Sequence, residues 1–215
     1  MESDEYRPPT PWIVWLLAAA MVLTYGAFVL TPLPQQNAID AAFAVIPSRF
    51  NPENPARFTH WYEAAVPLFG HAFLHLAWWH AAINAFFFFM LGRQPAMKLG
   101  WWRFLTVFFS GAVLGGIAFV VLNWNSDQAA IGASGGVCGV FSAYFMSVGR
   151  SWRDAFTDPR LRGPLVMIFF LNVVLMGVAA EAGVFPIAWE GHLGGFVGGA
   201  FAYAILAPKP RGPWG

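Results

Sequence analysis

The chain has 215 residues, of which 58% are hydrophobic and only 11% are charged, and its mean hydropathy is +0.54. This composition excludes an ordinary soluble domain and is typical of a protein that crosses the membrane several times. The net charge of +1 gives no basic field for nucleic acid, and the single cysteine, Cys138, excludes an intramolecular disulfide and a CxxC metal or redox site.

Six apolar stretches approach the length of roughly 20 residues that a bilayer-crossing helix needs. Backbone groups in lipid must be paired within their own segment, and the alternating pattern of a membrane barrel is absent, so we expect an all-α bundle of six transmembrane helices. The first stretch follows the acidic "MESDEYRPPT" and is interpreted as a retained helix, not a signal peptide. The stretches are residues 11–30, 64–91, 101–122, 131–148, 164–180 and 189–206.

The basic residues indicate how these helices cross the membrane. Cytoplasmic loops are enriched in Lys and Arg, so we expect both termini in the cytoplasm and the second, fourth and sixth helices to begin on the outer side. We divide the chain into a short segment at 1–10, one six-helix domain at 11–207 and a tail at 208–215. The residues on the expected cytoplasmic side are Arg7, Arg93, Lys98, Arg103, Arg150, Arg153, Arg160, Arg162, Lys209 and Arg211.

Four histidines and an asparagine lie in the expected second and sixth helices, where polar side chains are costly and suggest a site. His80 and Asn84 are four residues apart and share one helix face, so they would donate hydrogen bonds to an oxyanion or fix the bundle by interhelical bonds. His71 and His75 share a face nearer the outer boundary, where we expect them to order a loop.

Ser134 lies in "IGASGGVCGVFS", at the expected start of the fourth helix. The first N–H groups of a helix lack internal partners and favour negative charge, so a serine there is placed to attack a carbonyl while main-chain N–H groups receive the oxyanion. The alternative is that Gly132 and Gly136, four residues apart, form a packing ridge that merely tolerates the serine.

His192 is the candidate base for this serine, because a serine hydroxyl is unreactive without one. Gly195 and Gly199 follow it and give the sixth helix a face that can pack closely on the glycines of the fourth. Helix packing alone is the simpler explanation of these glycines and of the histidine beside them. No Asp or Glu falls inside an expected span, and Glu190 is expected at a helix end. The sequence therefore favours a Ser-His dyad over a triad.

The three motifs together resemble the rhomboid intramembrane serine proteases over nearly the whole chain. The matching residues are the GxSG motif Gly132, Ala133, Ser134 and Gly135; the histidine and small residues His192, Gly195 and Gly199; and the second-helix set His71, His75, His80 and Asn84.

The resemblance implies that Ser134 is the nucleophile and His192 the base, with His80, Asn84 and the Ser134 amide as oxyanion donors. It implies cleavage of transmembrane protein substrates near the outer end of their helices, within the lipid bilayer and without metal, ATP or another cofactor. It also favours a bacterial inner membrane, and it gives no indication of the oligomeric state.

Two departures from the family pattern affect positioning. Many rhomboids carry a Trp-Arg pair before the histidine run, where this chain has "AAVPLFG", so the first loop must be anchored differently. Many also have a tyrosine one turn after the serine, where this chain has Cys138. The apolar loop from Ala182 to Trp189 is expected to cover the site as a lid, and "NWNSDQAAIG" to supply a polar loop before Ser134.

Three other functions are compatible with parts of this pattern. A proton or ion transporter would use the histidines as a relay, but helix breaks at matching places in two repeat halves are absent. A metal or haem site would use His71, His75, His80 and His192, but HExxH is absent and no carboxylate accompanies them. A catalytically inactive rhomboid relative would bind membrane proteins without cleaving them.

Overall fold

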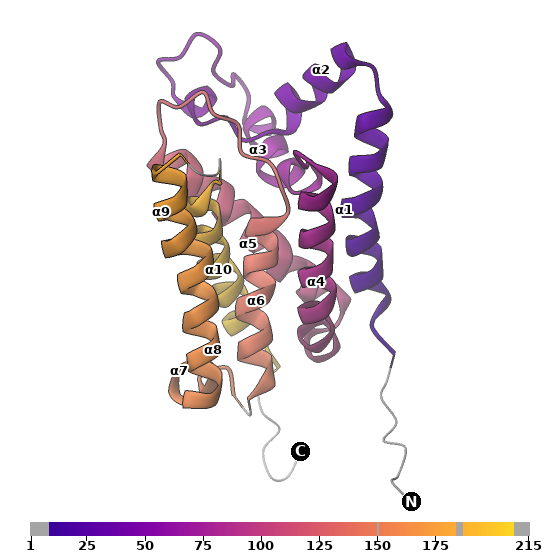
Figure 1. Ribbon diagram of the computed structural model, residues 1–215, viewed down its shortest axis with the longest axis vertical. Coiled ribbons are helices and arrows are strands. Elements are labelled where there is room, and N and C mark those ends of the chain that lie inside the picture. The colour runs from indigo at the N-terminus through magenta and orange to yellow at the C-terminus, as the bar shows by residue number, and fades with distance from the viewer. Residues whose placement is uncertain (1–8, 150, 184–186, 209–215) are drawn as a thin grey trace, which may run out of the picture.

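Long helices that run side by side dominate the structure, a computed structural model that describes residues 9–149, 151–183 and 187–208 (Figure 1). In chain order its helical elements are α1 (Trp12–Leu30), α2 (Leu33–Phe43), η1 (Pro47–Phe50), α3 (Trp61–Gly70), η2 (His71–Phe73), α4 (Trp78–Leu99), α5 (Trp101–Leu122), α6 (Ser134–Val148), α7 (Asp154–Thr157), α8 (Pro159–Phe169), η3 (Phe170–Leu175), α9 (Met176–Glu181) and α10 (Trp189–Leu206).

The predicted all-α class is confirmed. Within the described ranges, β pairing is limited to one isolated bridge between Val45 and Ala130. Three segments are long and apolar enough to cross a membrane: α1, α5 and the continuous helix 159–181 formed by α8, η3 and α9. The bent pair of residues 61–73 and 78–99 adds a fourth if it is counted as one span. The count of six spans stays a prediction, since α6 has only 15 residues.

The expectation of one straight helix over residues 64–91 is wrong. The chain bends by 86° between the segment that ends at Phe73 and α4, which begins at Trp78. Partners from elsewhere satisfy the backbone at this break: the hydroxyl of Thr24 on α1 donates to the carbonyl of Phe73 at 2.9 Å, and Gly132 N–H donates to the carbonyl of His71 at 2.9 Å. His71 and His75 therefore do not share a helix face.

The long helices alternate in direction (Figure 1). α1 runs from Trp12 to Leu30 toward the end of the molecule where α2 and α3 lie. Each later long helix runs opposite to the long helix before it in the chain. The first residues of α4, α6 and α10 consequently lie at the same end. This is the arrangement that the alternation of the expected spans predicted.

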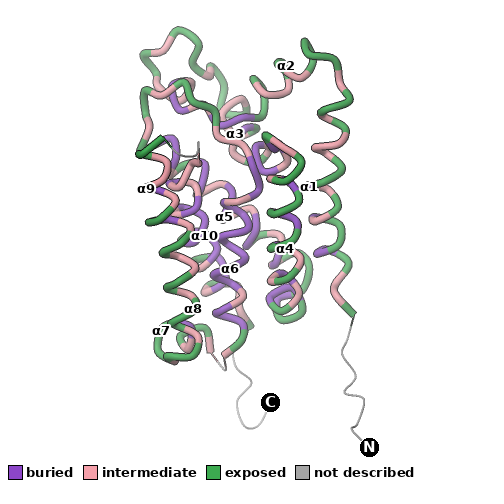
Figure 2. Tube along the Cα trace, in the orientation of Figure 1, coloured by how far each residue is buried: buried purple, intermediate pink, exposed green. Residues whose placement is uncertain are grey.

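Helix α6 lies at the centre of the bundle and is buried along most of its length, whereas α1 and the helix 159–181 are largely exposed (Figure 2). Glycines allow α5, α6 and α10 to approach one another closely. A Cβ on Gly195 would fall on the main chain of Gly135, one on Gly199 would fall on Gly139, and one on Gly111 would lie 3.1 Å from the Cα of Gly139. These contacts bring the first turns of α6 and α10 together.

Gly132 does not belong to this packing. It precedes α6 and has a φ of 127°, while Gly136 faces the ring of Phe108. The alternative of a helical ridge built from Gly132 and Gly136 is therefore wrong.

The first loop, residues 31–60, is anchored to the segment 123–130 that leads toward Ser134. The Val45–Ala130 bridge is followed by a 2.6 Å hydrogen bond from the Ser48 hydroxyl to a carboxylate oxygen of Asp127. The amide of Asn51 donates to the side-chain oxygen of Asn125 at 2.9 Å. This pairing holds the loop without the Trp-Arg pair that the family pattern led us to look for.

Candidate active site

Ser134 is the first residue of α6, and the turn before it is held in place by η2 and by the break before α4. Gly132 N–H donates to the carbonyl of His71, and Ala133 N–H points at Nε2 of His75 at 3.4 Å. The ring of His80 lies so close to Gly132 that a Cβ there would be 2.7 Å from its Cε1. The positive φ of Gly132 and this close approach both require glycine, so the turn fixes where the serine emerges.

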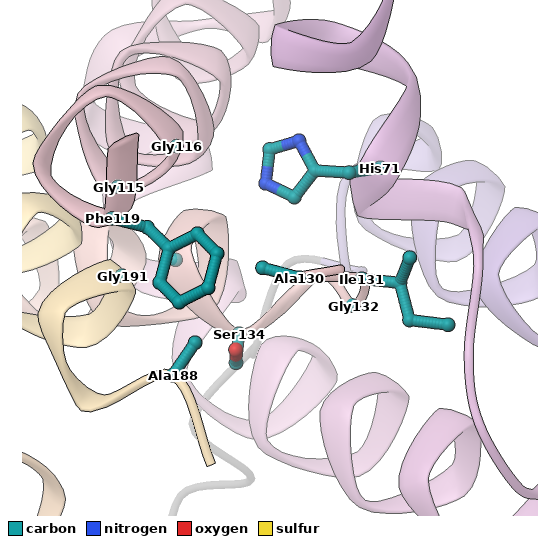
Figure 3. A pocket seen from close by; sticks show the side chains of 11 residues that line it. His71, Gly115, Gly116, Phe119, Ala130, Ile131, Gly132, Ser134, Ala188 and Gly191 are labelled. Carbon is teal, nitrogen blue, oxygen red and sulfur yellow. The ribbon is translucent and has the colours of Figure 1, made fainter. Parts of the chain in front are cut away.

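The side chain of Ser134 borders a small cavity of about 30 Å³, which has room for a water molecule (Figure 3). The rings of His71 and Phe119 and the main chain of Gly191 line the same space. Figure 3 shows the ring of His71 directed into the cavity from the side opposite Ser134. The lining is mostly apolar, and His71 and Ser134 are the two polar side chains that a water molecule in the cavity would meet.

His192 lies on the first turn of α10 and is buried, with an exposed fraction of 9%. Its Nδ1 lies 2.9 Å from the main-chain carbonyl oxygen of Asn172. A carbonyl oxygen can only accept a hydrogen bond, so Nδ1 is the donor. In a neutral imidazole the lone pair is then on Nε2, which can accept a proton.

The starts of α6 and α10 meet beside the cavity. A Cβ on Gly135, next to Ser134, would lie 3.3 Å from the carbonyl oxygen of Gly191, next to His192. Ser134 and His192 are not hydrogen-bonded to each other in the described part of the chain. Hydrogen bonds between catalytic groups are often long in free enzymes and tighten when substrate binds, so the absence of this bond does not exclude a dyad.

His80 and Asn84 both lie on α4, and the ring of His80 reaches the turn before Ser134, beside Gly132. The ring of His80 packs edge-on against that of His75, with 5.1 Å between the ring centres. Asn84 is buried, and its amide nitrogen donates to the carbonyl of His80 at 3.0 Å. Because a side-chain amide has two N–H groups, one of them remains for a ligand.

Two neighbours of His192 were missed by reasoning from sequence. Glu190, expected at a helix end, is a buried residue of the first turn of α10, and it accepts a 2.9 Å hydrogen bond from the Asn123 amide at the end of α5. Asn172 contributes a main-chain carbonyl, for which a side-chain pattern carries no signal. Cys138 is buried one turn after Ser134, in the core.

The remaining expectations concern the lid, the basic residues and the alternative of a metal site. Part of the expected lid falls on residues 184–186, outside the described residues, as do Arg7, Arg150, Lys209 and Arg211. Across the described ranges, no three His, Cys, Asp or Glu side chains are arranged to hold a metal ion, so the geometry gives the metal-site alternative no support.

Comparison with known proteins identifies relatives of the chain. Residues 59–209 match the family model described as Rhomboid domain. Rhomboid protease GluP of Bacillus subtilis (strain 168) is 28% identical over 155 residues, which cover 72% of this chain and 28% of that protein. Rhomboid-type serine protease 2 of Emericella nidulans is 26% identical over 145 residues, covering 65% of this chain and 25% of that protein.

The match to a third relative covers a larger share of that relative than the first two matches do. Rhomboid-related protein 2 of Mus musculus is 23% identical over 220 residues, which cover 96% of this chain and 68% of that protein. By contrast, the matches span only 28% and 25% of the length of the bacterial and fungal relatives.

Proposed function

The chain belongs to the rhomboid family of multi-pass membrane proteins, and we propose that it is an intramembrane serine endopeptidase with a Ser134–His192 dyad. The observation that carries the proposal is the meeting of α6 and α10 at Gly135 and Gly191, beside a cavity that Ser134 borders. Support comes from Ser134 and His192 lying on the first turns of two helices that contact each other at this point. The tautomer of His192, with the lone pair on Nε2, supports the role of base.

The proposed reaction begins when Ser134 Oγ attacks the carbonyl carbon of the scissile peptide bond and His192 Nε2 accepts its proton. The negative oxygen of the tetrahedral intermediate is stabilised by the N–H of Ser134, by His80 and by the second amide N–H of Asn84. His192 then returns the proton to the departing amine, leaving an acyl-enzyme. Water attacks this ester, again with His192 as base, and releases the acid product and free Ser134.

The proposed substrates are transmembrane helices of other proteins, cleaved near their outer ends. An intact helix hides its carbonyls in internal hydrogen bonds, so segments with helix-destabilising residues would be cleaved best. Six spans are proposed, formed by α1, α4, α5, α6, the helix 159–181 and α10, with α3 lying outside them. Both termini would be cytoplasmic and the site would lie in the outer half of a bacterial inner membrane. Arg93, Lys98 and Arg103, near the end of α4 and the start of α5, support this orientation.

The test is cleavage of a model transmembrane substrate by the protein reconstituted in liposomes. We expect product with the native chain and none with Ser134→Ala or His192→Ala, and we expect a fluorophosphonate to label Ser134. Undiminished cleavage by either variant would contradict the dyad. Absence of cleavage by the folded native chain, with Ser134 unlabelled, would favour the inactive relative that only binds membrane proteins.

A further inference from the structure

The helix 159–181 contains a π-helical turn, η3, at Phe170–Leu175, and this turn packs against α10. In an α-helix the carbonyl of residue 172 would accept the N–H of residue 176. Here Met176 N–H donates to the carbonyl of Val173 instead. The π-turn thus releases the carbonyl of Asn172 from its ordinary partner, and turns of this kind are frequent at functional sites.

The released carbonyl is the one that accepts the Nδ1 proton of His192, at 2.9 Å. The side chain of Asn172 takes no part in that bond, because its amide nitrogen donates to the carbonyl of Ile168 at 2.9 Å within the same helix. The bond therefore depends on the path of the main chain through the π-turn and not on the side chain at position 172.

The helix that provides this carbonyl lies on the outside of the bundle, and only 11% of its apolar stretch is buried inside the protein. Its attachment to α10 is concentrated around the π-turn. Val173 is buried there, and Gly177 packs on the ring of Trp189, where a Cβ would lie 3.3 Å from the ring atoms. The hydrogen bond to His192 belongs to this small docking area.

We propose that the main-chain carbonyl of Asn172, released by the π-turn, is the positioning group that holds His192 with its proton on Nδ1 and its Nε2 directed toward Ser134. In Ser-His-Asp enzymes a carboxylate performs this task. Here a peptide carbonyl takes the place of the carboxylate at Nδ1. The inference rests on the proposed function for its catalytic meaning, but the tautomer and its cause can be measured without activity.

The first experiment reads the ring directly. The Ser134→Ala chain, labelled with ¹⁵N in histidine and ¹³C at the carbonyl of Asn172, is reconstituted in lipid and studied by solid-state NMR near neutral pH. We expect the His192 proton on Nδ1, with a dipolar coupling between Nδ1 and the Asn172 carbonyl carbon. A proton on Nε2, or absence of that coupling, would overturn the proposal whether or not the native chain proves to be a protease.

The second experiment removes the π-turn. Deletion of Val174, whose side chain is 43% exposed, shortens the turn toward an α-helix, while Val174→Ala at the same position keeps the turn and serves as the matched control. We expect the deletion to lower kcat at least tenfold with little change in KM. This loss is a part of the roughly 10²–10⁴-fold rate increase that a general base supplies. We also expect the deletion variant to show a mixture of His192 tautomers.

Val174→Ala should retain both the native kcat and the native tautomer. A folded deletion variant with native kcat and a native ¹⁵N spectrum would contradict the proposal. If the deletion prevents folding, the NMR experiment on the full-length chain decides. Failure of the native chain to cleave any substrate would contradict the proposed function alone.

Discussion

Gly195 of α10 packs directly on Gly135 of α6, so that a Cβ on Gly195 would lie 2.9 Å from the Cα of Gly135. This approach is closer than side chains permit, and it is made next to both members of the proposed dyad. The first turns of α6 and α10 therefore approach each other through two residues that have no side chain.

We expect Gly195→Ala to push the first turns of α6 and α10 apart and to lower kcat at least tenfold, since small displacements of reacting groups cost large factors in rate. Overpacking should also destabilise the fold by about 1–3 kcal/mol. Gly26→Ala on α1, where a Cβ would meet nothing within 4 Å, is the matched control. Equal activity of the two variants in a liposome cleavage assay would show that the close approach is unimportant.

Alanine variants of Gly132 and Gly100 separate the effect of backbone strain from the effect of a clash with a neighbouring side chain. Both have positive φ, 127° and 78°, but only Gly132 faces a side chain, the ring of His80. Gly100→Ala should cost about 1–3 kcal/mol of stability from backbone strain, since φ 78° with ψ 168° is a region that only glycine adopts readily, and should leave cleavage near native. Gly132→Ala should cost more and abolish cleavage by displacing His80. Thermal unfolding and cleavage rates measure both effects, and similar losses in the two variants would contradict the importance of the contact with His80.

The hydrogen bond from Ser48 to Asp127 is expected to hold the first loop over the segment before Ser134. Ser48 is buried, and hydrogen bonds to charged groups contribute roughly 1.5–3 kcal/mol. We expect Ser48→Ala to raise hydrogen exchange at the amides of Val45 and Ser48 and to slow cleavage several-fold. Thr157→Ala, which removes a hydroxyl that donates only to Arg153 of its own turn, is the control. Unchanged exchange in Ser48→Ala would argue against the anchor.

Glu63 is expected to make the start of α3 sensitive to acid. Hydrogen bonds from the main-chain N–H groups of Thr59 and His60 lower the pKa of its carboxyl below the usual 4.5. A carboxyl with a lowered pKa stabilises the folded state at pH values above its unfolded pKa, and that contribution is lost as the pH falls through the folded pKa.

Protection of the Thr59 and His60 amides against hydrogen exchange should therefore decrease on acidification below pH 4.5 in the native chain. In Glu63→Gln it should be lower at neutral pH and depend little on pH, after correction for intrinsic exchange. A native-like acid response in Glu63→Gln would show that other groups cause it.

The sequence allowed the helices and the motifs to be predicted because both are properties of local segments. Apolar length indicated the helices, and the alternation of spans predicted that Ser134 and His192 begin their helices at the same end. The break before Trp78 could not be predicted, because the groups that satisfy it, the Thr24 hydroxyl and the Gly132 N–H, lie far away in the chain. The role of the Asn172 carbonyl could not be predicted either, because every residue has a main-chain carbonyl and only the π-turn distinguishes this one.

The cavity beside Ser134 has a consequence for the second half of the proposed reaction. Its space of about 30 Å³ for the centre of a water molecule lies against the serine and the ring of His71, so water can be held there before a substrate arrives. In the proposed mechanism the nucleophile that resolves the acyl-enzyme would thus be stored inside the protein. The lifetime of the ester would then depend on how fast this reservoir refills and not on the water content of the surrounding lipid.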